Sequence, residues 1–254
     1  MIKMCIISGA EDNLLSKFID STGNITSKYH CYILRNKPTE IKLAKEQKKK
    51  ITIRVVDNKN YSKDGQLQLL KLRLDSITLA SPNKDDILML GDDDMYFYEN
   101  FSFDDVLSVF EKNFDMVLAY SYTQRLTWRI VKNTGIYNGL YFRFNENALK
   151  RLEEYKEAVG GGEDGLIASV HYDEFDGKAA QIYLPKLVHI GHNTSSYFYE
   201  KGKNKRIVDI LEYIISSERG EELNKKTKKF IDSVGIKFKQ APREIYINHK
   251  QVEA

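Results

Sequence analysis

Short apolar runs alternate with segments of helical periodicity along the first half of the chain, and this alternation restricts the fold more than any other feature. Runs with the length and composition of buried strands are "MIKMCIIS", "HCYILRN", "ITIRVVDN" and "DDILMLGDDD". Apolar residues recur at helical spacing in "DNLLSKFIDS" and "KDGQLQLLKLRLDSITLAS". Because strands that alternate with helices form parallel sheets, we predict an α/β fold with a central mixed, mostly parallel sheet flanked by helices.

The second half of the chain continues this pattern. We expect helices at 102–113, with Ser102 as N-cap, at 146–158, ending at the glycine run 160–162, and at 163–175. We expect strands at 114–123, within 128–145 and within 179–196. After Tyr199 we expect an amphipathic helix at 206–219 and a second helix around 221–235, in a Lys-rich tail. We therefore divide the chain into a domain at 1–199 and a short, basic, helical C-terminal extension at 200–254.

Composition excludes several classes of protein. A chain of 254 residues with 42% hydrophobic and 30% charged residues is typical of a globular protein and argues against disorder. No run approaches the roughly 20 apolar residues that span a bilayer, so no transmembrane segment is expected. Cys5 and Cys31 have neither metal-binding nor redox spacing. We expect a cytoplasmic protein.

Three consecutive aspartates, Asp92, Asp93 and Asp94, follow the apolar run "ILMLG". Carboxylate oxygens suit Mg²⁺ or Mn²⁺, and phosphates can complete the coordination of such an ion. In an extended segment, Asp92 and Asp94 would point to one side and Asp93 to the other. A polar loop after a strand is an equally good interpretation of this motif taken alone.

Two later motifs carry similar chemistry. "GGGEDG" combines glycines, including Gly161 and Gly162, which permit close backbone approach, with two carboxylates at a helix start, Glu163 and Asp164. These carboxylates suit either a general base or simple helix caps. "LPKLVHIGHNTSS" supplies His189 and His192, which are either metal ligands or structural residues at a strand end.

Together the motifs "LMLGDDDM", "GGGEDG" and "PKLVHIG" resemble, in order and spacing, nucleotide-sugar glycosyltransferases of the GT-A fold. The resemblance spans roughly 1–199 and implies a GT-A-like nucleotide-binding fold. It implies Mn²⁺ or Mg²⁺ as cofactor and a nucleotide-diphosphate sugar, most simply a UDP-sugar, as donor of a hexosyl or pentosyl group. The acceptor hydroxyl would belong to a glycan or to a hydroxymethylated base in phage-type DNA.

The resemblance also implies roles for individual residues. Asp94 would bind the metal, and Asp92 would contact the ribose or the metal shell, with Asp93 as a substitute in the acidic cluster. His189 or His192 would be a metal or diphosphate ligand. Asp164 would be the catalytic base, and Glu163 would hold acceptor hydroxyls. Gly161 and Gly162 would approach the bound donor.

Two other functions fit parts of the sequence. A sugar nucleotidyltransferase shares the architecture and the metal-binding aspartates, but "SGAEDN" near the N-terminus lacks the basic residue needed to cradle a triphosphate. A nucleic-acid-binding module without catalysis would use the basic residues of 200–254, which number 13 against 9 acidic ones, and the aromatic residues Tyr197, Phe198 and Tyr199.

Overall fold

The computed structural model describes residues 1–9, 12–57, 65–98, 100–120, 139–156, 163–175, 179–184, 187–189 and 238–240. Its strands are β1 (Ile2–Ser8), β2 (Tyr29–Arg35), β3 (Ile51–Val55), β4 (Ile87–Asp92), β5 (Met95–Phe97), β6 (Met116–Tyr120), β7 (Leu140–Arg143), β8 (Ala179–Tyr183), β9 (Leu187–His189) and β10 (Phe238–Gln240). Its helices are α1 (Asp12–Thr22), the 3₁₀ turn η1 (Gln47–Lys49), α2 (Gly65–Leu79), α3 (Asp104–Glu111), α5 (Glu146–Glu153) and α6 (Glu163–Glu174). No helix in these ranges is long and apolar enough to cross a membrane.

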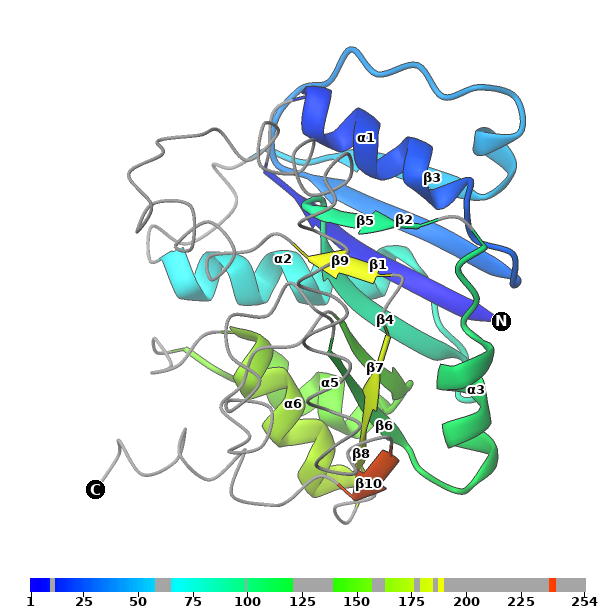
Figure 1. Ribbon diagram of the computed structural model, residues 1–254. Helices are drawn as coiled ribbons and strands as arrows, with labels where there is room; N and C mark the ends of the chain where they lie inside the picture. Colours follow the sequence, from blue (N-terminus) through cyan, green and yellow to red (C-terminus); the bar gives the residue numbers. More distant parts are fainter. Residues whose placement is uncertain are drawn as a thin grey trace, which may run out of the picture.

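Eight strands form the main sheet, in the order β10-β8-β6-β7-β4-β1-β2-β3 (Figure 1). β1 pairs in parallel with β2 and β4, β2 with β3, and β6 with β8. β7 runs antiparallel to both its neighbours, as β10 does to β8. The predicted mixed, mostly parallel sheet flanked by helices is therefore confirmed. Because β1 to β4 all run the same way, their carboxyl ends share one edge of the sheet.

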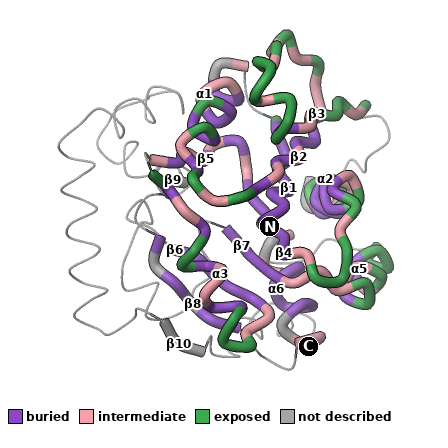
Figure 2. The backbone as a smooth tube through the Cα atoms, turned by 90° about the vertical axis from the view of Figure 1, so that its right-hand side faces the viewer, coloured by how far each residue is buried: buried purple, intermediate pink, exposed green. Residues whose placement is uncertain are grey.

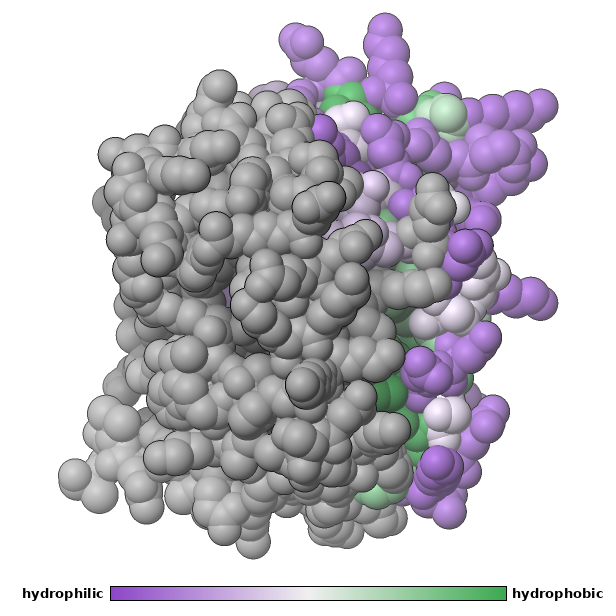
Figure 3. Space-filling view, in the orientation of Figure 1, coloured by the Kyte–Doolittle hydropathy of each residue, from purple (hydrophilic) through white to green (hydrophobic). Residues whose placement is uncertain are grey.

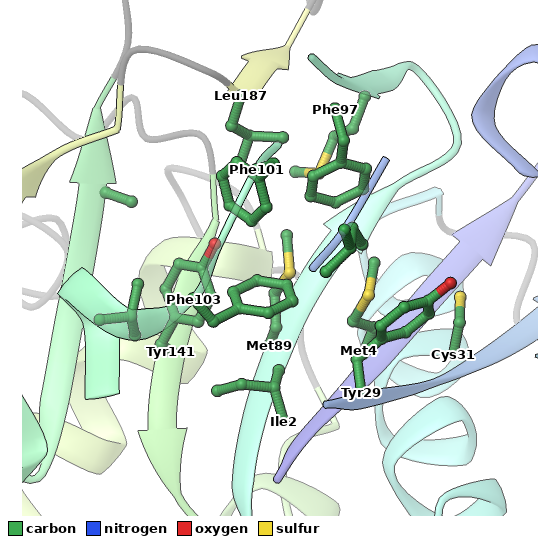
Figure 4. Close-up of a cluster of buried hydrophobic side chains, with 14 of the residues drawn as sticks. Ile2, Met4, Tyr29, Cys31, Met89, Phe97, Phe101, Phe103, Tyr141 and Leu187 are labelled. Atoms are coloured by element: carbon green, nitrogen blue, oxygen red, sulfur yellow. The ribbon is translucent and has the colours of Figure 1, made fainter. Parts of the chain in front are cut away.

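Two hydrophobic cores lie on opposite faces of this sheet. On one face, α1, α3 and the β5–β9 ribbon pack against apolar side chains of β1, β2 and β4, and phenylalanines from β5 and the segment before α3 fill the centre (Figure 4). On the other face, α2, α5 and α6 cover β4, β6 and β7. Figure 2 shows the resulting arrangement, in which the strands are mostly buried and exposed residues lie on the outer sides of the helices and in connections such as that between β2 and β3.

The two cysteines occupy different faces of the sheet. Cys5 belongs to the core beneath α2, whereas Cys31 belongs to the core beneath α1, and both are fully buried. Burial raises the pKa of the Cys5 thiol to about 12. Both cysteines therefore act as small apolar core residues, as the sequence indicates for Cys5.

Several predicted elements differ from the structure. α5 ends at Glu153, before the glycine run, and the N-cap of α3 is Phe103, although Ser102 Oγ still accepts a hydrogen bond from the Asp104 N–H at 3.1 Å. The strand expected within 179–196 is two strands, β8 and β9, which belong to different sheets.

The C-terminal region is described only in β10, a strand that the sequence does not predict. The two helices expected after Tyr199 lie outside the described residues. The division of the chain at residue 200 remains a prediction.

Candidate active site

The first acidic motif lies at the carboxyl edge of the sheet. Asp92 is the last residue of β4 and pairs in register with Ile7 of β1. The residues of β4 before Gly91 are buried between the two cores, whereas the Asp92 side chain is one-third exposed. The apolar run thus forms a central strand that delivers a carboxylate to the edge where ligands bind in open α/β sheets.

Asp93 and Asp94 do not continue the strand but form a turn that leads into β5. The extended geometry assumed from the sequence is therefore wrong beyond Asp92. Asp93 is buried, with 6% of its surface exposed, while Asp92 and Asp94 are partly exposed. Asp92 and Asp94 are the members of this cluster that solvent, and hence a ligand, can reach.

Gly91 leaves room for two side chains that pack over the end of β4. A Cβ at this position would lie 2.8 Å from Met95 Sδ and 3.1 Å from Ile6 Cδ1, so the ends of these side chains would have to shift. The absence of a side chain at residue 91 therefore allows Met95 to pack closely against the strand that carries Asp92.

Arg73 of α2 joins the first acidic motif to the second. Its guanidinium is 1% exposed and donates to the Gly91 carbonyl and to Asp92 Oδ1, the latter at 2.8 Å. The same Nη2 atom lies 3.6 Å from Oε1 of Glu163, whose side chain is 13% exposed. A single buried cation thus holds two carboxylates that are far apart in the sequence.

Sequence reasoning missed Arg73, although a signal for it exists. Leu70, Leu74 and Ile77 are buried and follow helical spacing along α2, and Arg73 occupies a position in the same row. A charged residue on the apolar face of a helix indicates a buried ionic partner, because an unpaired buried charge is costly.

The second motif is described only in part. Glu163 begins α6, as predicted, and Asp164 lies in the first turn of the same helix, although its side chain is not described. Gly161 and Gly162 lie outside the described residues. The structure therefore brings the start of α6 to the acidic cluster through the contact between Arg73 and Glu163.

The third motif reaches the same place through the β5–β9 ribbon. In this antiparallel pair, His189 is in register with Met95, the residue that follows Asp94 (Figure 1). The side chain of His189 is not described, and His192 lies outside the described residues. The backbone pairing nevertheless sets residue 189 directly beside the end of the acidic turn.

A buried arginine also lies at the neighbouring part of the edge, next to the end of β1. Arg35 Nη1 donates to Ser8 Oγ at 2.7 Å, and Nη2 donates to Asp12 Oδ1. Asp12 also accepts hydrogen bonds from the Glu40 N–H at 3.0 Å and from Thr39 Oγ1 at 3.2 Å. The hydrogen bond from Glu40, together with the Arg35 charge, lowers the pKa of Asp12.

The residues present suit a hard divalent cation. Among the side chains that the structure describes, no three His, Cys, Asp or Glu residues cluster as a complete metal site. Mg²⁺ and similar ions commonly bind one or two carboxylates and complete their shell with substrate phosphates and water. Asp92 and Asp94 provide such a pair, and one Asp92 oxygen is already engaged by Arg73.

Comparisons with known proteins give only distant likenesses. No family model and no curated protein matches the chain. Among solved structures, it is similar to S. aureus TarS 1–349 in complex with UDP-GlcNAc (TM-score 0.49, 14% identity, 92% of this chain and 73% of that one). It is also similar to glucosyl-3-phosphoglycerate synthase from Mycobacterium tuberculosis in complex with Mn²⁺, UDP and glucosyl-3-phosphoglycerate (TM-score 0.42, 14% identity, 83% of this chain and 78% of that one).

A further similar structure is the galactosyltransferase LgtC in complex with donor and acceptor sugar analogs (TM-score 0.42, 10% identity, 72% and 73%). The identities and TM-scores are all low. The function proposed below is therefore argued from the geometry of the site.

Proposed function

We propose that the protein is a metal-dependent glycosyltransferase of the GT-A type, which transfers a sugar from a nucleotide-diphosphate sugar to an acceptor hydroxyl. The observation that carries this proposal is the convergence of three separate motifs at one sheet edge. Arg73 joins Asp92 to Glu163, and the β5–β9 pairing sets His189 beside the acidic turn. A polar loop or a simple helix cap would give no reason for these motifs to meet.

Each residue has a role in this reaction. Asp94, a partly exposed carboxylate in the turn that leads into β5, would be the principal metal ligand, and Asp92 would contact the ribose or the metal shell. His189 would be a further ligand to the metal or the diphosphate, with His192 as the alternative. When bound, Mn²⁺ or Mg²⁺ would stabilise the charge that develops on the leaving diphosphate.

The carboxylates at the start of α6 would act on the acceptor. In the transfer, the acceptor oxygen bonds to the anomeric carbon as the bond between that carbon and the diphosphate oxygen breaks. Asp164 would take the hydroxyl proton in an inverting reaction, and Glu163 would orient the acceptor. Arg73 would keep Glu163 and Asp92 in fixed relative positions. The bound donor and the bound acceptor would then be held at a constant distance and orientation.

Activity against a panel of nucleotide sugars tests this proposal. With Mn²⁺ present, UDP-sugars are expected to give UDP release that is lost on chelation of the metal. Asp94→Ala and Asp164→Asn should both abolish it, whereas Asp85→Asn, an exposed residue just before β4, should not. Full activity in both site variants would refute the assignment of these residues.

Thermal stability separates the enzyme from a nucleic-acid-binding module. Stabilisation by UDP with Mn²⁺ supports the transferase, and stabilisation only by DNA or RNA supports the binding module.

For the acceptor, we propose a glycan or a hydroxymethylated base in DNA. A DNA acceptor requires binding that weakens steeply with salt, whereas salt-insensitive activity on an oligosaccharide selects the glycan.

A further inference from the structure

Basic residues are dense in one short segment of the part of the chain that the structure describes. Residues 42–54 contain six basic residues and one acidic residue, a formal charge of +5, whereas the whole chain carries +3. The remainder of the chain therefore sums to a formal charge of −2. We call this segment, which comprises the end of the β2–β3 connection and most of β3, the basic ridge.

The basic ridge is held firmly against the domain. Ile41, Leu43 and Ile53 pack against the hydrophobic core beneath α1, whereas Lys42, which lies between the first two, is exposed. Gln47 accepts a hydrogen bond from the Ala44 N–H at 2.8 Å and donates one to Asp20 of α1 at 3.4 Å. The positions of the charges are thus fixed by packing.

Most of these charges are not neutralised within the protein. Lys49 pairs with Glu46 at 2.8 Å, and Lys50 lies over the Tyr29 ring at 5.2 Å. No carboxylate of the described residues pairs with the exposed side chains of Lys42, Lys45, Lys48 and Arg54. Hydrophilic side chains project from this part of the molecule in Figure 3, at the upper right.

The ridge also lies on an edge of the main sheet. β3 is the terminal strand, paired only with β2 among the described strands, and its exposed Arg54 and Val55 lie at the carboxyl end. Because β3 is parallel to β1, this end is on the same side of the sheet as Ser8 and Asp92. Lys48 to Lys50 mark the opposite end of the ridge, before β3 begins.

We propose that the basic ridge docks the protein on an anionic phospholipid surface. Five of the six basic residues are lysines, which act as hydrated point charges towards many phosphates and do not form the planar fork that arginine offers to one phosphate. Residues 36–57 include no aromatic side chain on which a nucleic-acid base could stack. Clusters of four to eight basic residues that lie next to a membrane-spanning helix or on an amphipathic helix bind anionic lipid headgroups, and we infer that the same attraction acts on the exposed lysines of the ridge.

Vesicle co-sedimentation tests the proposal independently of catalysis. The full chain is expected to bind vesicles of phosphatidylcholine with 30% phosphatidylglycerol at low salt, and to bind pure phosphatidylcholine vesicles far more weakly. The triple variant Lys42→Gln/Lys45→Gln/Lys48→Gln should lower the partition coefficient roughly 100-fold, since each lysine near an anionic surface contributes about fivefold. It should still bind UDP with Mn²⁺ if the wild-type protein does.

A matched variant controls for net charge. Lys84→Gln/Lys150→Gln/Lys156→Gln removes three exposed lysines outside the ridge and should change vesicle binding less than fivefold. Equal losses in the two triple variants would overturn the proposal, and so would the absence of vesicle binding by the wild-type protein. Ridge-dependent binding to duplex DNA without vesicle binding would assign the ridge to nucleic acid and would also overturn it.

Discussion

Two arginines, Arg35 and Arg73, are each 1% exposed at the same edge of the sheet, yet their partners differ. Arg35 contacts Asp12, whose two oxygens also accept hydrogen bonds from Thr39 and Glu40. Arg73 contacts Asp92 and Glu163, which come from two of the motifs for which we propose metal and acid–base chemistry. The first arrangement ties a loop to a helix, and the second joins carboxylates of two motifs that are far apart in the sequence.

This difference shows that burial of a charge does not by itself identify a functional site. At Arg35, the protein itself supplies the hydrogen-bond donors that surround the carboxylate. At Arg73, the carboxylates lie beside a turn with a partly exposed Asp94. A structural role is therefore expected for Arg35, and a role in positioning the catalytic groups for Arg73.

Removal of the Arg73 guanidinium should have the largest effect. In Arg73→Gln, two carboxylates lose a shared buried cation, so the free energy of unfolding should fall by about 3 kcal/mol. Displacement of Asp92 and Glu163 should lower kcat/KM about 100-fold in the protein that remains folded. Urea unfolding and UDP release measure the two effects.

A lysine at position 73 should not restore activity, because one ammonium cannot reproduce the contacts of the guanidinium with Gly91 and Asp92. The control is Arg151→Gln, which removes an arginine that pairs with Glu174 at 2.6 Å but is 42% exposed. It should cost less than about 1 kcal/mol. If kcat/KM is unchanged in Arg73→Gln, Arg73 has only a structural role, like the one expected for Arg35.

The pH dependence of the free energy of unfolding should report a buried histidine of the core and not the two arginine sites. Burial lowers the pKa of His171 from 6.5 to about 4, and its ring lies 4.0 Å from that of Phe142. The folded protein holds this histidine neutral while the unfolded chain binds a proton. Stability should therefore fall by up to about 3 kcal/mol as pH falls from 6.5 to 4.

The arginines keep their charge throughout this range. His171→Gln should therefore flatten the pH dependence of the free energy of unfolding between pH 6.5 and 5. An equally steep dependence in the variant would place the titrating group elsewhere.

The Arg35 site should affect stability more than activity. Arg35→Gln leaves Asp12 without its charge partner and Ser8 without a donor, and because Asp12 is 39% exposed we expect a loss of about 2 kcal/mol. The kcat/KM of the folded protein should change less than tenfold. A loss of activity as large as that of Arg73→Gln would make Arg35 part of the catalytic site.

Two glycines on the same sheet edge, one beside each arginine site, allow the same comparison with smaller expected effects. Gly91→Ala forces Met95 to shift and should cost about 1 kcal/mol, with a tenfold loss of kcat/KM because Asp92 follows directly. Gly9→Ala, near the Arg35 site, places its Cβ at an ordinary 3.6 Å from the Asn36 side chain. It should change stability by less than about 0.5 kcal/mol, and equal effects would contradict the tight packing of the acidic turn.

Much of the fold could be predicted because the apolar pattern is local. The strands around Met4 and Met89 are almost continuously buried, and the helix around Leu70 buries residues at helical spacing, so their composition and periodicity are distinctive. The separation of β8 from β9 could not be predicted in this way, because it depends on the pairing of β9 with a distant strand, β5. Local patterns determine which segments are strands but not which strands pair.

In the candidate site too, local motifs could be predicted from the sequence, whereas contacts between distant segments could not. The motifs around Asp92, Glu163 and His189 were singled out from the sequence. In the structure, the Arg73 side chain joins Asp92 to Glu163, and the β5–β9 pairing sets the backbone of residue 189 beside Met95. The turn at Asp93 was missed because an extended strand and a tight turn are equally compatible with three aspartates. Arg73 was missed because a charged residue within a leucine-rich helix reveals its partners only in three dimensions.

Calorimetric titration of UDP in the presence and absence of Mn²⁺ tests the central claim, that the acidic turn holds a metal for a nucleotide diphosphate. In the wild-type protein, we expect UDP binding that requires Mn²⁺ and is lost with EDTA. Asp94→Asn should weaken this binding at least 10-fold, and the control Asp85→Asn should not change it. UDP binding that is equally tight without Mn²⁺, or unchanged in Asp94→Asn, would contradict the account.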